Sequence, residues 1–256
     1  MFNDKPYSEV NREERFFCFL FAHALLSSRD VRVGFAELAK RTCDIVLDSD
    51  QLEVYVEVAA LRDYWNDLCS PAEYSDATHG RRRTVLEQIL KIREVEPEIL
   101  DKHDLFWTSP NKKKLWSPSH WSIEELKNAG LEKLKEVRCA FNAKPDILLV
   151  SPKTMLVIEA KLESGEVRKD ETGYKQYEIQ ELIVDLWKQL ISEFQHRKLA
   201  QARLEVKGAG NNTITWSDIL GIIADSDIDD FTRRSLNQLK RYSSGKSGVT
   251  NALQGN

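Results

Sequence analysis

The sequence of 256 residues is poor in the side chains that form disulfides or bind zinc. Its four cysteines, Cys18, Cys43, Cys69 and Cys139, have no metal-ligand spacing, and we expect them to be reduced packing residues. The five histidines are scattered without any paired spacing, so we assign none of them a role. The sequence therefore points away from a zinc site and from a disulfide-stabilised fold.

Long apolar runs are also missing, because no stretch of the sequence approaches the length of a membrane span. The apolar stretch around Phe16 to Leu26 is preceded by Glu13 and Glu14 rather than by the basic region of a secretion signal. We therefore expect a cytoplasmic protein that has no membrane partner.

A strong charge of either sign is the third missing feature, since 37 Lys and Arg residues against 41 Asp and Glu residues give a net charge of −4. This balance argues against nonspecific coating of nucleic acid, although it leaves room for a local basic groove. The hydrophobic content of 41% suffices for one sizeable core. We expect a single domain over residues 1–242 and a disordered tail at 243–256.

The most informative stretch, residues 144–166 (KPDILLVSPKTMLVIEAKLESGE), has the pattern of a β-hairpin. Two runs of aliphatic residues flank a short turn centred on Pro152 and Lys153. In a hairpin with this turn, Asp146 directly faces Glu159. Directly opposed residues share a sheet face, with Cβ atoms roughly 4.5–5.5 Å apart. The pattern therefore predicts two neighbouring carboxylates.

A lysine joins this pair, because Lys161 follows Glu159 by two residues and leaves the strand on the same face. The run from Met155 to Ile158 is apolar without alternation, which is typical of a strand covered on both faces. Carboxylates at the end of such a strand must be paired or bound to a metal, and two of them suit Mg²⁺ or Mn²⁺. A simpler interpretation makes them solvated partners of Lys161. Like charges directly opposed on two paired strands are destabilising without a cation, which favours the interpretation as a metal site.

The spacing Pro145-Asp146, twelve residues, then Glu159-Ala160-Lys161 resembles the signature of the PD-(D/E)XK nuclease superfamily. The resemblance implies an α/β restriction-endonuclease-like core with a mixed central sheet, ordered helix, three strands, helix, strand, helix (α-βββ-α-β-α). It also implies that Asp146, Glu159 and the backbone carbonyl of Ala160 bind the metal. In that superfamily the lysine, here Lys161, orients or activates the attacking water.

The first helix is predicted over residues 11–28 and carries Glu14 next to Arg15. Many members of the superfamily place a glutamate beside the metal on this helix, often followed by arginine, so the resemblance makes Glu14 a catalytic candidate. A second interpretation is a variant capping box, in which Glu14 lies three residues after Asn11 and satisfies a backbone donor. Both interpretations stay open, with Glu13 as the fallback.

The remaining core elements follow from apolar periodicity. The first core strand is predicted at about 134–142. A long amphipathic helix is predicted at 171–203, a strand at 219–227, and a last helix over the sequence DIDDFTRRSLNQLKRY that follows.

Five residues are candidates for nucleic-acid binding. Gln176 and Gln180 fall in the first turns of the long helix, where related nucleases often contact phosphate, although their interpretation as ordinary polar positions of a surface helix is favoured. Lys112, Lys113 and Lys114 lie in a Pro- and Ser-rich loop and would attract phosphate. Three tryptophans flank these lysines and either offer stacking surfaces or fold back as anchors: Trp107, Trp116 and Trp121.

A largely helical insertion is expected at about 30–130, between the first helix and the first strand. Its predicted helices cover 34–45, 50–69 and 80–94. The insertion could act as a lid, as a DNA-binding surface, or as the contact for a homodimer or a protein partner, and the sequence does not choose among these.

The expected function is hydrolysis of phosphodiester bonds with Mg²⁺ as the cofactor and Mn²⁺ as its substitute. DNA is favoured over RNA, and an endonuclease of the restriction, defence or repair type is favoured, by analogy with the superfamily. The alternative is a partner-dependent or catalytically silent subunit that has the nuclease fold and binds nucleic acid or assembles with a larger system.

Overall fold

The computed structural model describes residues 14–68, 75–108, 114–162, 176–208 and 210–240. The chain divides into two compact units. The sheet unit comprises Met1–Val58, Pro145–Gly165 and Arg197–Asn256, and the helical unit comprises Ala59–Lys144 and Glu166–His196. Each unit therefore combines segments that are distant in the sequence.

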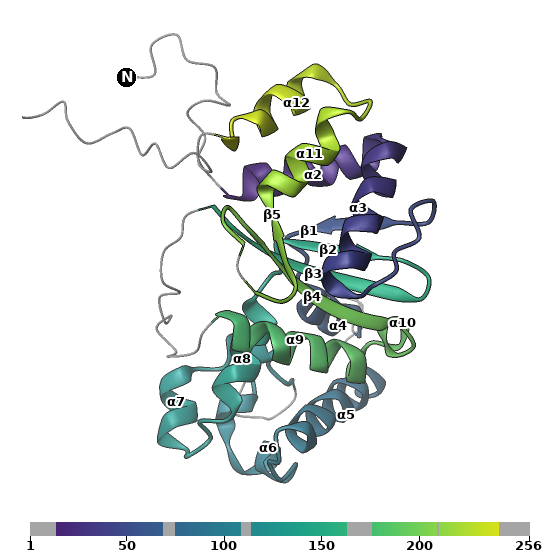
Figure 1. Ribbon diagram of the computed structural model, residues 1–256. Helices are drawn as coiled ribbons and strands as arrows, with labels where there is room; N and C mark the ends of the chain where they lie inside the picture. Colours follow the sequence, from purple (N-terminus) through teal and green to yellow (C-terminus); the bar gives the residue numbers. More distant parts are fainter. Residues whose placement is uncertain (1–13, 69–74, 109–113, 163–175, 209, 241–256) are drawn as a thin grey trace, which may run out of the picture. The chain divides into compact units, whose positions relative to one another are not determined.

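The sheet unit contains a five-stranded open sheet with the strand order β1-β2-β3-β4-β5 (Figure 1). Its strands are β1 (Glu53–Val56), β2 (Ile147–Val150), β3 (Thr154–Lys161), β4 (Lys198–Glu205) and β5 (Thr213–Thr215). The pairs β1–β2 and β2–β3 are antiparallel, whereas β3–β4 and β4–β5 are parallel. The predicted α/β class with a mixed sheet is confirmed.

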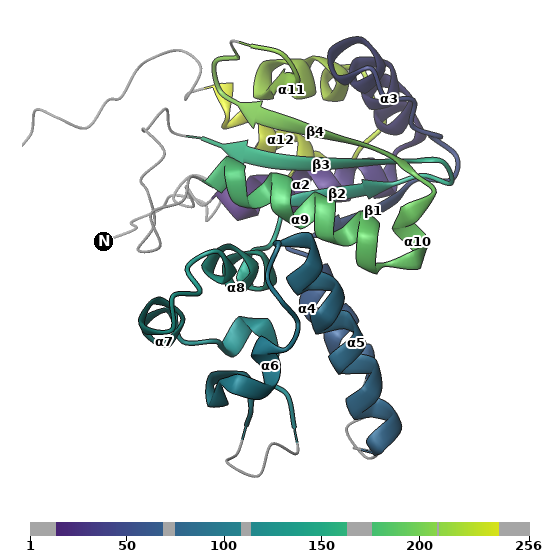
Figure 2. The same cartoon turned by 90° about the horizontal axis from the view of Figure 1, so that it is seen from below.

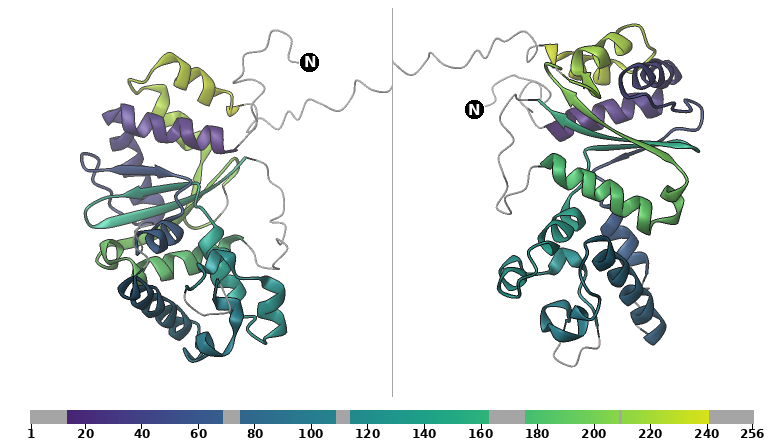
Figure 3. Two further views of the ribbon diagram at one scale, coloured as in Figure 1. Left: turned by 180° about the vertical axis from the view of Figure 1, so that it is seen from behind. Right: turned by 60° about the horizontal axis from the view of Figure 1, so that its bottom comes forward.

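Four helices of the sheet unit cover one side of this sheet (Figures 1 and 3). They are α2 (Glu14–Ser27), α3 (Arg29–Cys43), α11 (Trp216–Ala224) and α12 (Asp230–Asn237). Their buried side chains form one core with Ile147 and Ile158 of the strands. Within it, the rings of Phe21 and Phe35 meet edge to face with centroids 5.2 Å apart, which joins α2 to α3.

The helical unit has its own buried aromatic side chains, and its helices can be followed in Figure 2. Helix α9 (Gln176–Leu190) packs against α4 (Ala60–Asp67), α5 (Asp76–Ile92) and α8 (Leu134–Asn142). Trp65 and Phe141 meet edge to face, and the Arg82 guanidinium lies 4.9 Å from the centre of the Trp65 ring. The remaining short elements are α6 (Ile99–Lys102), η1 (Asp104–Phe106), η2 (Pro118–His120), α7 (Ile123–Asn128) and α10 (Ser192–Gln195).

Two predicted strands are helices in the structure. The segment 134–142, predicted as the first core strand, forms α8, because Leu134, Val137 and Phe141 recur at helical spacing and are all buried. The segment 219–227 falls mainly in α11, which starts earlier, at Trp216. A short apolar run is compatible with a strand or with a buried helix, and in both places the helix is the correct structure.

The first strand in the described part of the chain is β1, within the segment 50–69 that was predicted as a helix. The strand ends at Val56, the next residue, Glu57, has a left-handed φ of 55°, and α4 begins only at Ala60. The largely helical stretch of the chain therefore follows β1 rather than preceding the first strand. Helix α3, which was counted within the predicted insertion, packs in the core of the sheet unit.

The long helix predicted at 171–203 is also wrong in its second half. Helix α9 ends at Leu190, and β4 begins at Lys198 and pairs with β3 along its whole length. Tertiary pairing in the sheet overrides the helical periodicity of this segment. The other predicted helices are confirmed: the first helix as α2, 34–45 as α3, which starts earlier and ends at Cys43, 80–94 as α5, and the last helix as α12. Residues 11–13 and the tail 243–256 lie outside the described residues.

Candidate active site

The hairpin of β2 and β3 has the predicted register. Ile147 pairs with Ile158 and Val150 pairs with Met155. The turn is closed by Ser151 N–H donating to Thr154 O at 2.8 Å, with Pro152 and Lys153 between them. One step beyond the pair Ile147–Ile158, Asp146 therefore stands opposite Glu159.

Both carboxylates lie at a buried position, since Asp146 and Glu159 are each 8% exposed. Ile147 and Ile158 belong to the core, so side-chain alternation places Asp146 and Glu159 on the opposite face of the sheet. The backbone N–H of Ala160 donates to Asp146 Oδ2 at 2.8 Å. This hydrogen bond fixes the Asp146 carboxylate beside the strand that carries Glu159.

Lys161 links β3 to the first turn of α2. Its Nζ lies 3.1 Å from Glu159 Oε1 and 3.4 Å from Glu14 Oε1. The other oxygen of Glu14, Oε2, accepts a hydrogen bond from the backbone N–H of Leu162 at 3.0 Å. The structure thus brings together four predicted site residues, Glu14, Asp146, Glu159 and Lys161, from segments far apart in the sequence.

Burial dominates the electrostatics of the two carboxylates. Burial, and then the neighbouring charge of Glu159, raises the pKa of Asp146 to about 7. Burial likewise raises the pKa of Glu159, against the opposing attraction of Lys161. For Lys161 burial alone lowers the pKa, but Glu159 and Glu14 outweigh it and the net pKa is raised. Lys161 is therefore a cation, and both carboxyl groups are harder to ionise here than in water.

Glu57 and its partner Arg15 adjoin this site, and Glu57 was missed in the sequence. The Glu57 N–H donates to the carbonyl of Asp146 at 3.2 Å, which extends the β1–β2 ladder by one residue. Its Oε1 lies 3.4 Å from Nε of Arg15, the residue after Glu14. The position of Glu57 directly after β1 could have identified it. This signal was missed because the segment that contains β1 was predicted as a helix.

Cys18 of α2 is buried close enough to the site to respond to its charges. Burial, and then the charges of Asp146 and Glu14, holds the pKa of the Cys18 thiol far above its usual range. Burial also raises the pKa of Cys43 to about 11. Both thiols stay protonated at neutral pH, which confirms them as packing residues; Cys69 lies outside the described residues.

The metal-donor chemistry is therefore that of oxygen. Within the described parts of the chain, no group of three or more His, Cys, Asp or Glu side chains is arranged to hold a metal ion. The oxygen donors that could hold a cation are the carboxylates of Asp146 and Glu159 with the backbone carbonyl of Ala160, and water or substrate would have to complete its shell. Such an incomplete, oxygen-only set fits Mg²⁺, which keeps several waters, better than a transition metal.

The predicted nucleic-acid-binding residues belong to the helical unit. Lys112, Lys113 and the side chain of Gln176 lie outside what the structure describes. Lys114 is exposed, whereas the Gln180 side chain is only 7% exposed. Of the three tryptophans near the lysines, two are packed as anchors and one is partly exposed: Trp107 at 6%, Trp121 at 1% and Trp116 at 37%.

Comparisons of the chain with models of known protein families, with curated proteins and with solved structures found no match. Among the helices that the structure describes, none combines the length and the apolar character needed to cross a membrane.

Proposed function

We propose that this chain is a metal-dependent nuclease that hydrolyses phosphodiester bonds, with DNA as its substrate and endonucleolytic cleavage as its action. One observation carries the proposal: the side chains of Asp146, Glu159 and Lys161 converge at the buried end of a hairpin, where Lys161 also reaches Glu14. Lys161 and Glu159 alone would suffice for a purely structural ion pair. A second buried carboxylate, Asp146, directly across the ladder from Glu159 lowers stability, so its presence favours a function.

The order of elements supports a restriction-endonuclease-like core. Along the chain, α2 and α3 are followed by β1, β2 and β3, then by α9, the short α10 and β4. With the helices α4 to α8 placed between β1 and β2, this order agrees with the helix, three strands, helix and strand of the PD-(D/E)XK superfamily. The spacing of Asp146, Glu159 and Lys161 on β2 and β3 agrees with its signature.

Asp146, Glu159 and the carbonyl of Ala160 would hold Mg²⁺, or Mn²⁺ in its place. When bound, the cation neutralises charge on the scissile phosphate and lowers the pKa of water. Asp146 is kept in position by the Ala160 N–H. The buried pair of carboxylates gives the site the negative charge that selects a divalent cation.

Lys161 would orient the attacking water and add positive charge near the scissile phosphate. Glu14 contributes by holding the Lys161 ammonium together with Glu159 and by accepting the Leu162 N–H. We therefore assign Glu14 as a positioning residue for Lys161. Its distance to Lys161 Nζ, 3.4 Å, gives this role a direct geometric basis.

The test is cleavage of supercoiled plasmid DNA by the full-length protein in Mg²⁺, Mn²⁺ or EDTA. The proposal expects nicking or linearisation that requires the metal, and a loss of roughly 100-fold or more in Lys161→Ala and in Glu159→Gln. A matched control is Lys198→Ala, which removes a lysine of the neighbouring strand β4 whose Nζ lies 3.2 Å from Asp44 Oδ2. This variant should cut like the wild type.

Cutting that persists in both active-site variants would show that the nuclease activity comes from elsewhere. If the wild type leaves plasmid, linear DNA and RNA intact although it binds Mg²⁺ through Glu159, the chain is instead a partner-dependent subunit. If it neither cuts nor binds the metal, the alternative of a catalytically silent nuclease-fold protein holds.

A further inference from the structure

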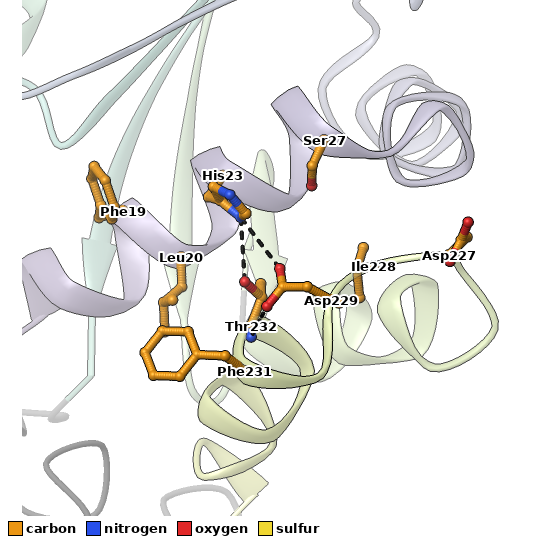
Figure 4. Close-up of a pocket in the computed structure, with 9 residues that line it drawn as sticks. All are labelled: Phe19, Leu20, His23, Ser27, Asp227, Ile228, Asp229, Phe231 and Thr232. Atoms are coloured by element: carbon orange, nitrogen blue, oxygen red, sulfur yellow. Dashed lines mark hydrogen bonds and ion pairs between the residues drawn. The ribbon is translucent and has the colours of Figure 1, made fainter.

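A pocket of about 620 Å³ opens in the sheet unit between α2 and the segment that leads into α12 (Figure 4). Its floor is apolar and buried, since Leu20 is 3% exposed and Ile228 is 8% exposed. Phe19 and Phe231 stand at its rim and are 60% and 61% exposed. The four residues of the candidate active site are not among those that line this pocket.

Exposed hydrophobic side chains gather at this pocket. The described residues include six large hydrophobic side chains that are exposed: Phe19, Leu26, Val46, Tyr55, Trp116 and Phe231. Two of them line the pocket, and a third, Leu26, follows Phe19 by seven residues and so lies on the same face of α2. Clustered exposed hydrophobic residues mark interaction sites, and aromatic residues are the usual anchors of protein interfaces.

The charged lining of the pocket is acidic. Asp227 and Asp229 line it, together with His23, and no lysine or arginine among the described residues does. Asp229 caps α12 by accepting hydrogen bonds from Thr232, which hold the pKa of its carboxyl below the usual range. Asp227 is exposed and makes no hydrogen bond or ion pair with any described residue. Its carboxylate is therefore available to a ligand.

Polar contacts across the pocket tie its two walls together. His23 Nδ1 of α2 lies 3.2 Å from Thr232 Oγ1 and 3.7 Å from Asp229 Oδ2 (Figure 4). Thr232 is buried, and α2 packs directly against α12. The pocket is thus formed before any ligand arrives, which lowers the entropic cost of binding.

We propose that this pocket is a docking site for a basic and apolar segment of a partner protein. An arginine or lysine of the segment pairs with Asp227, and its aliphatic neighbours pack between Phe19 and Phe231. Charge complementarity selects the cation, and the exposed rings add aromatic surface for its stem and charge. The volume leaves room for more than one side chain. Nucleic acid is disfavoured here because the carboxylates repel phosphate.

Binding by the full-length protein tests this proposal independently of nuclease activity. The probe is a fluorescein-labelled peptide of eight residues in which leucine and arginine alternate, measured by fluorescence anisotropy at about 0.15 M salt. Two matched peptides replace arginine by glutamate or leucine by serine. The leucine–arginine peptide should bind at least about tenfold more tightly than either, because the site requires both charge and apolar contact.

Variants of the pocket locate the binding. Asp227→Asn and Phe231→Ala should each weaken the peptide at least about tenfold, and their exposure predicts unchanged thermal unfolding. Val46→Ala removes an exposed side chain of the same unit, 64% exposed, and should bind like the wild type. Glu159→Gln should also bind like the wild type, which separates the pocket from the acidic active site.

Four outcomes would overturn the proposal. These are no binding of the leucine–arginine peptide, equal binding of the glutamate peptide, affinity that is unchanged in both pocket variants, and affinity lost only in Glu159→Gln. Sedimentation of the wild type supplies a fifth: a dimer that Phe231→Ala dissociates would make a second copy of the chain the occupant.

Discussion

At the scale of single residues, Asp146 and Glu159 raise the question of why two carboxylates are buried side by side. Burial raises the pKa of both, so each is harder to ionise in the folded protein than in the unfolded chain. Such a pair weakens the metal-free protein, and replacing buried charges by neutral groups commonly stabilises a fold. The cost is understandable if the pair serves a cation.

The first prediction concerns stability against pH. Because the pKa of Asp146 is about 7 when folded and 3.8 in its ordinary state, the folded protein binds more protons than the unfolded chain between these values. The stability that depends on Asp146 therefore falls as the pH rises from about 4 to about 7 and is level above. Asp146→Asn removes this loss, so in EDTA its stability advantage over the wild type should grow across that window.

The measurement is urea unfolding followed by circular dichroism at several pH values. Urea unfolding gives the free energy of unfolding at each pH. In a thermal scan, each 1 kcal/mol gained in that free energy would appear as a rise in Tm of roughly 2–4 °C in a chain of this size. Asp185→Asn, at an exposed position of α9, is the control and should show no such pH dependence. A constant difference between Asp146→Asn and the wild type across the pH range would contradict the raised pKa.

The second prediction concerns Glu57, which joins the end of β1 to Arg15. The ion pair is 27% and 73% exposed at its two side chains, so it contributes little to stability. The ion pair holds Arg15, the residue after Glu14, at the end of β1, where the Glu57 N–H donates to the Asp146 carbonyl. Glu57→Gln should therefore lower the rate of cleavage roughly three- to tenfold while Tm changes by less than about 1 °C.

A double-mutant cycle of Glu57→Gln with Arg15→Ala checks this role. If the pair acts as one unit, the double variant should be no slower than either single variant, with KM unchanged. Fully additive losses, with KM raised only in Arg15→Ala, would instead make Arg15 a contact to substrate phosphate.

At the scale of elements, α11 shows how local sequence fixes a helix start. Thr215 Oγ1 accepts from the Asp218 N–H at 3.1 Å, and Asp218 Oδ2 accepts from the Thr215 N–H at 2.8 Å. This reciprocal capping box begins the helix that buries Trp216 and Ile219 in the core. The helix start is thus tied directly to the packing of the sheet unit.

The third prediction follows from this cap. Thr215→Ala should lower the free energy of unfolding by about 0.5–2 kcal/mol, because the Asp218 N–H loses its acceptor and the Asp218 carboxylate loses the hydroxyl donor. Thr215→Ser keeps the hydroxyl and should lose much less. Urea unfolding of the three proteins measures the difference, and a serine variant as unstable as the alanine variant would mean that the threonine methyl group, not the cap, matters.

The hairpin was predictable from the sequence because its determinants are local. A two-residue turn fixes the register of β2 and β3, and the register alone puts Asp146 opposite Glu159. The segments 134–142 and 219–227 were not predictable in this way, since their short apolar runs fit a strand or a buried helix equally well. Only packing against distant parts of the chain decides between the two.

Strand β4 and the position of Glu57 were also not predictable from the sequence, because both depend on pairing between strands that are distant along the chain. Residues 198–203 look like the end of a helix until β3 offers a parallel partner along its full length. The place of Glu57 next to the site can be recognised only from the pairing of β1 with β2, in which the Glu57 N–H donates to the carbonyl of Asp146. The sequence therefore identified the candidate site residues Asp146, Glu159 and Lys161 but not Glu57, which adjoins them.

At the scale of the whole molecule, the chemistry and the predicted nucleic-acid contacts fall in different units. Glu14, Asp146, Glu159 and Lys161 all belong to the sheet unit, which the chain assembles from three separate segments. A site built in this way exists only in the folded state. A cation that binds there must therefore stabilise the sheet unit as a whole.

The fourth prediction is that Mg²⁺ raises the Tm of the full-length protein in a pH-dependent manner. At a hundredfold excess over its Kd, a ligand specific for the folded state adds about 2.7 kcal/mol of stability, equivalent to a rise of roughly 5–10 °C. The rise should be small near pH 5, where Asp146 is protonated and protons compete with the metal, and should grow through pH 7 as that proton is lost.

The check is differential scanning calorimetry with Mg²⁺ or with sodium salt of equal ionic strength, on the wild type, Glu159→Gln and Lys198→Ala. Screening acts on all three proteins alike, whereas coordination requires Glu159. An equal rise in Glu159→Gln would show that Mg²⁺ acts on surface charge rather than at this site. A rise that grows with pH in the wild type and in Lys198→Ala, and is lost in Glu159→Gln, would place the cation at the paired carboxylates even if no nucleic acid is cut.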